Sequence, residues 1–167
     1  MKRAMIVALA SVLSLSLAQS SYTAPDFRLM DTNGKIVQLS SFKGKPVVLN
    51  FWATWCHVCQ EELPKINAVY KRMPGKFVFL AVHRDPSIPI KDIKAWVKNK
   101  GWAFPAVVDA PAGTKNVDTI NAVSSRYQVF GTPYFFFIDK TGVLKAINPG
   151  GMTDETLKQN LELIGVR

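Results

Sequence analysis

Short apolar runs alternate with amphipathic stretches along most of this chain. Residues 46–52 and 76–82 are continuous runs rich in β-branched and aromatic side chains, which predict buried strands. From residue 56 onward, apolar side chains recur three or four positions apart, which is the spacing of one helix face. On the same criteria, strands are expected at 27–29, 36–39, 46–52, 76–82, 104–108, 134–138 and 143–147. Helices are expected at 56–73, 90–100, 117–127 and 154–164.

Turn and capping residues support this division. Asn33-Gly34 is a strong hairpin signal and joins the first two expected strands. Thr141-Gly142 lies between the last two strands, and Thr153 is a good N-cap for the final helix. Because strands alternate with helices, we expect an α/β fold whose sheet is covered on both faces and extended by an N-terminal β-hairpin.

Length and composition suit a single domain. The chain has 167 residues, of which 48% are apolar, and this is enough to build one core without structural staples. The net charge of +9 is basic without being extreme. The lysines at 91, 94 and 98 recur at helical spacing, as on a solvated helix face, and no arginine cluster or aromatic RNA-binding motif accompanies them. We therefore expect no nucleic acid partner, whereas acidic proteins or an anionic membrane surface suit this charge.

The N-terminus has the pattern of a targeting segment. Lys2-Arg3 precedes an uncharged apolar stretch at 4–17, and Ser16-Leu17-Ala18 is a small-x-small cleavage signal. This predicts a signal peptide at 1–18, a short linker at 19–24 and one domain at 25–167. The alternative is an uncleaved membrane anchor, although the stretch is short for a span of about 20 apolar residues. Either outcome places the domain outside the cytoplasm, in an oxidising compartment.

The only two cysteines, Cys56 and Cys59, lie three positions apart where a buried strand gives way to a helix. At a helix N-terminus, free N–H groups and the positive end of the helix dipole stabilise a thiolate at Cys56. Cys59 lies one turn further in, where it would be shielded, and would resolve a mixed disulfide made by an exposed Cys56. The spacing therefore predicts redox chemistry.

Two structural readings of the pair are less favoured. A disulfide staple gains little from so short a loop, because the entropic gain grows with loop length. Zinc requires four ligands, and only His57 and His83 are available beside the cysteines.

The chain resembles the thioredoxin fold and, within it, the exported TlpA-like thiol-disulfide oxidoreductases, a group that includes ResA and the cytochrome c maturation reductases. The resemblance covers nearly the whole chain after the targeting segment. Its residues are Ala24-Pro25-Asp26-Phe27, the stretch from Gly44 to Cys56, Cys59, Glu62, Pro64, Gly131-Thr132-Pro133 and Ile138-Asp139-Lys140-Thr141-Gly142. It implies a central mixed sheet with helices on both faces.

The resemblance also implies residue roles. Cys56 corresponds to the attacking cysteine and Cys59 to the resolving cysteine. Pro133, after Thr132, corresponds to a cis-proline beside the disulfide, and Trp55 offers an apolar contact surface. The activity implied is disulfide exchange with exported proteins, favouring a reductase that acts on substrates such as apocytochrome thiols and is supplied by a membrane electron donor. No cofactor or metal is implied, and an oxidase or isomerase role stays open.

Two positions depart from the family pattern. Asn50 stands where thioredoxin has a buried aspartate, so this side chain cannot relay a proton. The nearest substitute acid in the sequence is Asp85, although a solvated loop residue is an equal reading. His57 stands beside the attacking cysteine, where an imidazolium would lower the pKa of Cys56; an exposed polar residue is the alternative.

Two other protein classes share parts of the pattern. Peroxiredoxins have a similar opening, but Leu49 and Ala53 occupy the two positions where their motif requires Pro and Thr or Ser. A Sco-like copper carrier uses two cysteines and a distant histidine. His83 is the only distant histidine here, and the cysteine spacing is one residue short of that family's.

Overall fold

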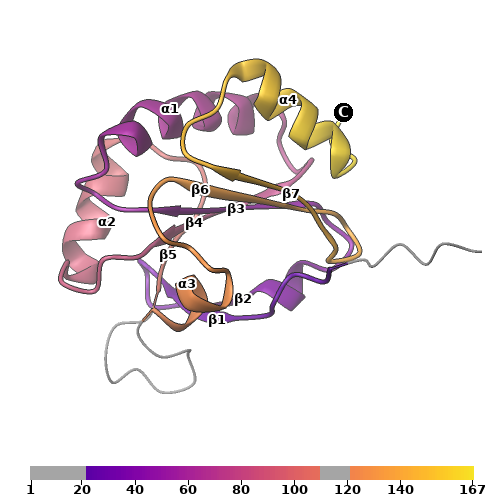
Figure 1. Ribbon diagram of the computed structural model, residues 1–167. Helices are drawn as coiled ribbons and strands as arrows, with labels where there is room; N and C mark the ends of the chain where they lie inside the picture. The colour runs from indigo at the N-terminus through magenta and orange to yellow at the C-terminus, as the bar shows by residue number, and fades with distance from the viewer. Residues whose placement is uncertain (1–21, 110–120) are drawn as a thin grey trace, which may run out of the picture.

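The computed structural model describes residues 22–109 and 121–167, which form one seven-stranded mixed sheet with helices packed on it (Figure 1). The strand order is β2-β1-β5-β4-β3-β6-β7. The central strands β3, β4 and β5 are parallel, and the outer pairings are antiparallel. The strands are β1 (Arg28–Asp31), β2 (Ile36–Gln38), β3 (Val47–Trp52), β4 (Val78–His83), β5 (Ala106–Val108), β6 (Tyr134–Ile138) and β7 (Leu144–Pro149).

Helices cover both faces of the sheet. Helices α1 (His57–Arg72), α2 (Ile90–Asn99) and α4 (Asp154–Leu163) contribute to one buried cluster. Helix α3 (Ala122–Arg126) and the short 3₁₀ helix η1 (Leu39–Phe42) contribute to the cluster on the opposite face. The expected mixed sheet, with its N-terminal hairpin of β1 and β2, is confirmed.

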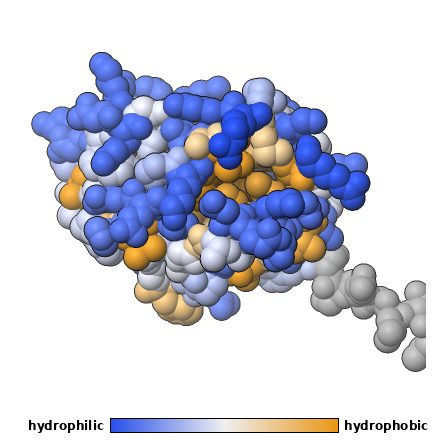
Figure 2. Space-filling model, turned by 90° about the horizontal axis from the view of Figure 1, so that it is seen from above, coloured by the Kyte–Doolittle hydropathy of each residue, from blue (hydrophilic) through white to orange (hydrophobic). Residues whose placement is uncertain are grey.

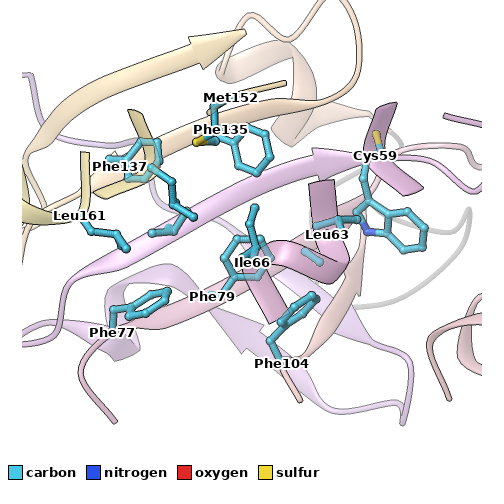
Figure 3. Close-up of a cluster of buried hydrophobic side chains, with 14 of the residues drawn as sticks. Cys59, Leu63, Ile66, Phe77, Phe79, Phe104, Phe135, Phe137, Met152 and Leu161 are labelled. Atoms are coloured by element: carbon cyan, nitrogen blue, oxygen red, sulfur yellow. The ribbon is translucent and has the colours of Figure 1, made fainter. Parts of the chain in front are cut away.

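Strand alternation explains the two cores. Successive side chains of a strand point to opposite faces, so Val48 and Trp52 of β3 belong to the cluster shared with α1, α2 and α4, while Leu49 and Phe51 belong to the cluster shared with α3 and η1. Figure 3 shows Leu63 and Ile66 of α1 among phenylalanines from the sheet. Burying each such side chain stabilises the fold by about 1.5–3 kcal/mol.

The groove between α1 and α4 is apolar at its floor and polar at its rims (Figure 2). Its floor includes Val69, Leu157 and Leu161. These residues lie beside the C-terminal half of α1, so the groove is separate from the first turn of α1, where the cysteines lie.

Some expected boundaries were wrong. Leu39 begins η1 instead of ending a strand, and the strand expected at 76–82 begins only at Val78. The helix expected at 117–127 is observed only from Ala122, and its residues 117–120 lie outside the described residues, as does the expected signal peptide at 1–18. Within the described part of the chain, no helix is both long and apolar enough to cross a membrane.

Candidate active site

The cysteines form a disulfide at the N-terminus of α1. The chain leaves β3 at Trp52, turns through residues 53–55 and enters α1 with Cys56 as the N-cap. The backbone N–H of Cys59 points at the Cys56 sulfur, with 3.1 Å between N and Sγ. One of the unpaired donors at the helix start is therefore directed at the sulfur that is expected to attack.

The two sulfurs differ in accessibility by less than expected. Cys59 is fully buried, as predicted for a resolving cysteine, but Cys56 is only 5% exposed and so is not the openly exposed residue that the sequence suggested. The reason is that an N-cap side chain folds back over the first turn of its helix.

Three hydrogen bonds hold the turn that presents Cys56. The Cys56 backbone N–H donates to the Ala53 carbonyl over 3.1 Å. The Gln60 side-chain amide donates to the Thr54 carbonyl over 2.8 Å, and the Thr54 N–H donates to Nε2 of His83 over 3.3 Å. The contributions of Gln60 and His83 were missed from the sequence, because both depend on tertiary placement.

The Thr132–Pro133 peptide bond is cis, as predicted. Pro133 directly precedes β6, whose first residue, Tyr134, is paired with Phe51 near the end of β3. The proline therefore lies at the same edge of the sheet as the turn that leads to Cys56. The hydroxyl oxygen of Thr132 is buried and has no hydrogen-bond partner among the described residues.

The loop before Pro133 is tied to the end of β4. Arg84 donates from its side chain to the Gly131 carbonyl over 3.2 Å and from its backbone to the Trp52 carbonyl over 3.0 Å. Beside this loop, Phe130 is 86% exposed. Phe130 was not predicted from the sequence, although a phenylalanine directly before the Gly131-Thr132-Pro133 motif is a usable signal.

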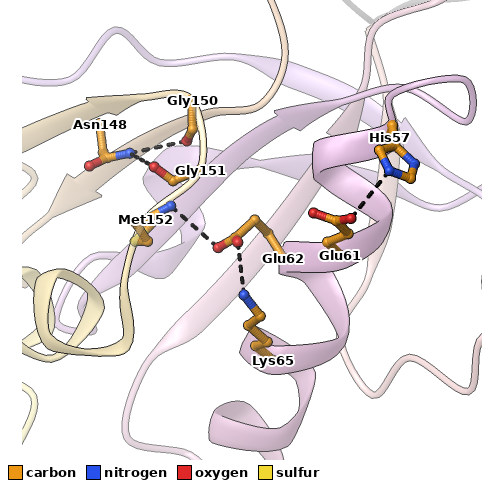
Figure 4. A network of polar contacts seen from close by, with 8 residues as sticks. All are labelled: His57, Glu61, Glu62, Lys65, Asn148, Gly150, Gly151 and Met152. Atoms are coloured by element: carbon orange, nitrogen blue, oxygen red, sulfur yellow. Dashed lines mark hydrogen bonds and ion pairs between the residues drawn. The ribbon is translucent and has the colours of Figure 1, made fainter.

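Glu62 provides the buried carboxylate of the site (Figure 4). It lies three residues after Cys59, so the two side chains occupy neighbouring positions on the surface of α1. Its Oε1 is 3.1 Å from the Lys65 ammonium, and its Oε2 accepts the Met152 backbone N–H over 3.3 Å. At Gly151, a Cβ atom would lie 3.6 Å from the Glu62 side chain, so this loop lies directly against the carboxylate.

Asp85, the substitute acid suggested by the sequence, has a different environment. Its carboxylate accepts hydrogen bonds from Ser87 and from the Trp55 indole, the latter over 2.8 Å. The Ser87 contacts, helped by Trp55, hold the pKa of Asp85 below its usual range. A carboxylate that stays ionised is a poor proton relay, so its visible effect is to orient Trp55, which is 65% exposed.

The side chain of His57 lies along the surface of α1 towards Glu61. Its Nε2 lies 3.2 Å from the carboxylate of Glu61, and both side chains are exposed (Figure 4). An electrostatic effect of His57 on Cys56 stays a prediction, and the Glu61 charge opposes it. Asn50, in place of the aspartate of thioredoxin, is fully buried and donates to the Tyr134 carbonyl.

His83 is fully buried and packs edge-on against Trp52, with ring centroids 4.8 Å apart. Burial lowers the pKa of His83 from 6.5 to about 4, although the nearby Asp85 charge acts in the opposite direction. Within residues 22–109 and 121–167, no cluster of three or more His, Cys, Asp or Glu side chains could hold a metal ion.

Known proteins share both the sequence and the fold. A family model described as AhpC/TSA matches residues 21–147. Over 143 residues, the chain is 38% identical to the thiol-disulfide oxidoreductase ResA of Geobacillus thermodenitrificans, a match that covers 85% of this chain and 76% of that protein. Two solved structures are similar. A thio-disulfide isomerase from Thermus thermophilus superposes with a TM-score of 0.74 at 28% identity, over 89% of this chain and 99% of that chain. A DsbE thiol:disulfide interchange protein from Chlorobium tepidum superposes with a TM-score of 0.69 at 28% identity, over 87% of this chain and 97% of that chain.

Proposed function

The chain belongs to the AhpC/TSA family and is a thiol-disulfide oxidoreductase, and from this premise we propose that it acts outside the cytoplasm as a reductase of disulfides in exported proteins. The Cys56–Cys59 pair carries the reaction. The direction of electron flow, from this protein to its substrate, is supported by the buried carboxylate of Glu62, one helical turn beyond Cys59.

The reaction runs through a mixed disulfide. In the reduced protein, the Cys56 thiolate attacks one sulfur of the substrate disulfide and releases the other as a thiolate. Cys59 then loses its proton, with Glu62 as the proposed acceptor, and its thiolate attacks the Cys56 sulfur. The second substrate sulfur leaves as a thiolate, so the substrate gains two electrons and the protein is left with the Cys56–Cys59 disulfide.

The charge of Glu62 favours this direction. A carboxylate held in a buried position near the cysteines repels thiolates, which exist only in the reduced protein. It therefore destabilises the reduced form relative to the disulfide. A protein whose reduced form is destabilised is a better electron donor, in contrast to DsbA, whose stabilised reduced form makes it a strong oxidant. The ammonium of Lys65, 3.1 Å from the Glu62 carboxylate, offsets part of this effect.

The surface around the disulfide suits a polypeptide substrate. Trp55, Val58 and Phe130 are exposed apolar side chains beside the cysteines or the Pro133 loop. Exposed aromatic residues are favoured contact residues in protein interfaces. We propose that an extended, apolar segment of an exported protein lies between Trp55 and Phe130 and brings its disulfide to Cys56. Apocytochrome c is one such substrate.

The location and the electron donor are parts of the same proposal. They rest on the expected signal peptide or anchor at 1–18 and on the resemblance to exported reductases. A reductase in an oxidising compartment needs a supply of electrons from across the membrane, so we propose a membrane protein as the donor that reduces the Cys56–Cys59 disulfide.

A second function, thiol oxidation or isomerisation, is favoured by one contact. The Cys59 N–H that donates to Cys56 Sγ stabilises a Cys56 thiolate and so acts against Glu62. The redox state of the pair in growing cells distinguishes the two functions. A reductase is kept mostly as the dithiol by its donor, and an oxidase is kept mostly as the disulfide. Acid trapping of the cells followed by alkylation of free thiols reports which form is present.

A further inference from the structure

His83 makes one polar contact that reaches the active-site turn. It is the last residue of β4, opposite Trp52 in the parallel pairing with β3. From there, its Nε2 accepts the backbone N–H of Thr54, two residues before Cys56, over 3.3 Å. The imidazole thus links the end of one central strand to the turn that follows the neighbouring strand.

This contact defines which nitrogen of the imidazole carries the proton. Because Nε2 is the acceptor, the single proton of the neutral ring lies on Nδ1. The low pKa of His83, caused mainly by burial, keeps the ring neutral at ordinary pH. Nδ1 is buried and makes no close hydrogen bond among the described residues, although the Asp85 backbone and the Asp85 charge act to raise the pKa of the ring against the effect of burial. The bond to Thr54 is therefore the well-formed polar contact of this side chain.

The turn held by His83 determines where the Cys56 sulfur lies. Thr54 is fixed at its N–H by His83 and at its carbonyl by Gln60, and the next hydrogen bond in the turn joins Cys56 N–H to Ala53. A shift of this turn would move the sulfur relative to the Cys59 N–H, which donates to it at 3.1 Å. That N–H stabilises a thiolate only while the sulfur stays in line with it.

We propose that His83 is a positioning residue for thiol-disulfide exchange: its neutral imidazole holds the Thr54 amide and thereby keeps the Cys56 thiolate aligned with the start of α1. The inference rests on the oxidoreductase activity of the Cys56–Cys59 pair but not on the direction of electron flow. His83 then has a function unrelated to the copper binding considered from the sequence.

The unmodified protein provides the first test. Long-range ¹H–¹⁵N correlation spectra of the imidazole at pH 7 distinguish the two neutral forms. The proposal predicts a proton on Nδ1 of His83 and an unprotonated Nε2, together with slow hydrogen exchange of the Thr54 amide. A proton on Nε2, or a freely exchanging Thr54 amide, would overturn it.

Matched variants provide the second test. In His83→Gln, an acceptor oxygen lies the same number of bonds from Cα as Nε2, whereas His83→Leu has no acceptor. In the reduced protein, the acid dissociation constant of Cys56, measured by ultraviolet thiolate titration, should fall by about two- to tenfold in His83→Leu, the range for one lost hydrogen bond. His83→Gln should stay within about twofold of the unmodified protein.

The control is Leu161→Ala in α4, which leaves a cavity beside the C-terminal half of α1, at the opposite end of that helix from Cys56. It should lower thermal stability without changing the Cys56 dissociation constant, and so separates general destabilisation from positioning. Equal effects of the Gln and Leu variants, or no effect of either, would contradict the proposal. If the protein is not a reductase, the reduction potential of the unmodified protein will show it. The ratios of the Cys56 dissociation constants between the variants and the unmodified protein would not change.

Discussion

The backbone N–H of Cys59 points at the sulfur of Cys56 from 3.1 Å, and this contact makes the two cysteines chemically unequal. Cys56 is the N-cap of α1 and receives the donor, while Cys59 lies inside the first turn and is fully buried. A thiolate is therefore stabilised at Cys56 and not at Cys59.

This inequality predicts which cysteine forms covalent complexes with substrates. A Cys59→Ser variant should accumulate mixed disulfides through Cys56, because nothing resolves them. Cys56→Ser should accumulate few, since the remaining thiol is inaccessible. Non-reducing gels of alkylated extracts, followed by mass spectrometry, measure both. Equal trapping by the two variants contradicts the assignment.

The buried carboxylate predicts a shift in reduction potential. Glu62→Gln removes a negative charge one turn from Cys59 and should stabilise the reduced form, so the potential should become less negative by up to about 30 mV, equivalent to about 1.4 kcal/mol. Glu61→Gln is the matched control, because Glu61 is exposed and its change should have a much smaller effect. A potential that is unchanged or more negative in Glu62→Gln would remove the proposed basis for electron donation.

His57 should have a small effect on the same equilibrium. A protonated imidazole next to Cys56 attracts the thiolate, while the helix dipole and the Glu61 contact act against it. We expect His57→Ala to raise the pKa of the Cys56 thiol by less than one unit and to lower the reduction potential slightly. Thiolate titration of the reduced proteins measures this. An unchanged or lower pKa would show that His57 is only a surface residue.

Burial of His83 predicts a dependence of stability on pH. Its pKa is about 4 in the folded protein against 6.5 for an ordinary histidine, so between these values the unfolded chain binds the proton and the folded chain does not. Stability should therefore fall as the pH drops from 6.5 towards 4, by about 3 kcal/mol over the full window. The lowered pKa values of Asp26, Asp85 and Asp139 add a further loss of stability that begins at about pH 5 and grows below it, so this loss overlaps only the acid end of the window.

Urea unfolding of the oxidised protein at several pH values measures this loss. The loss should be nearly absent in His83→Gln, because that side chain does not titrate. His57→Ala should retain most of it. If His83→Gln shows the same loss as the unmodified protein, the dependence comes from other groups.

Local sequence patterns were sufficient for most of the fold. The apolar runs predicted β3 and β4, Asn33-Gly34 predicted the hairpin of β1 and β2, and Thr153 predicted the start of α4, where its side chain accepts the Thr156 N–H. Leu39 was assigned wrongly because its apolar side chain packs equally well at the start of a 3₁₀ helix.

Contacts between distant segments could not be predicted in this way. Glu62 is buried because a loop 90 residues later donates the Met152 N–H to it. His83 reaches Thr54 only because β3 and β4 are parallel and in register at Trp52. Asp85 was considered as a proton relay from its position alone, whereas its contact with Trp55 depends on how the loop after β4 folds. These side chains acquire their functions from the sheet register and from loop packing.

The equilibrium reduction potential of the Cys56–Cys59 pair, measured against glutathione buffers at pH 7, tests the central claim most directly. A reductase whose dithiol form is destabilised by Glu62 should have a potential near that of thioredoxin, about −270 mV. A value close to that of DsbA, about −120 mV, would mean that the stabilised Cys56 thiolate dominates and that the protein withdraws electrons from its partners, contradicting the proposed function.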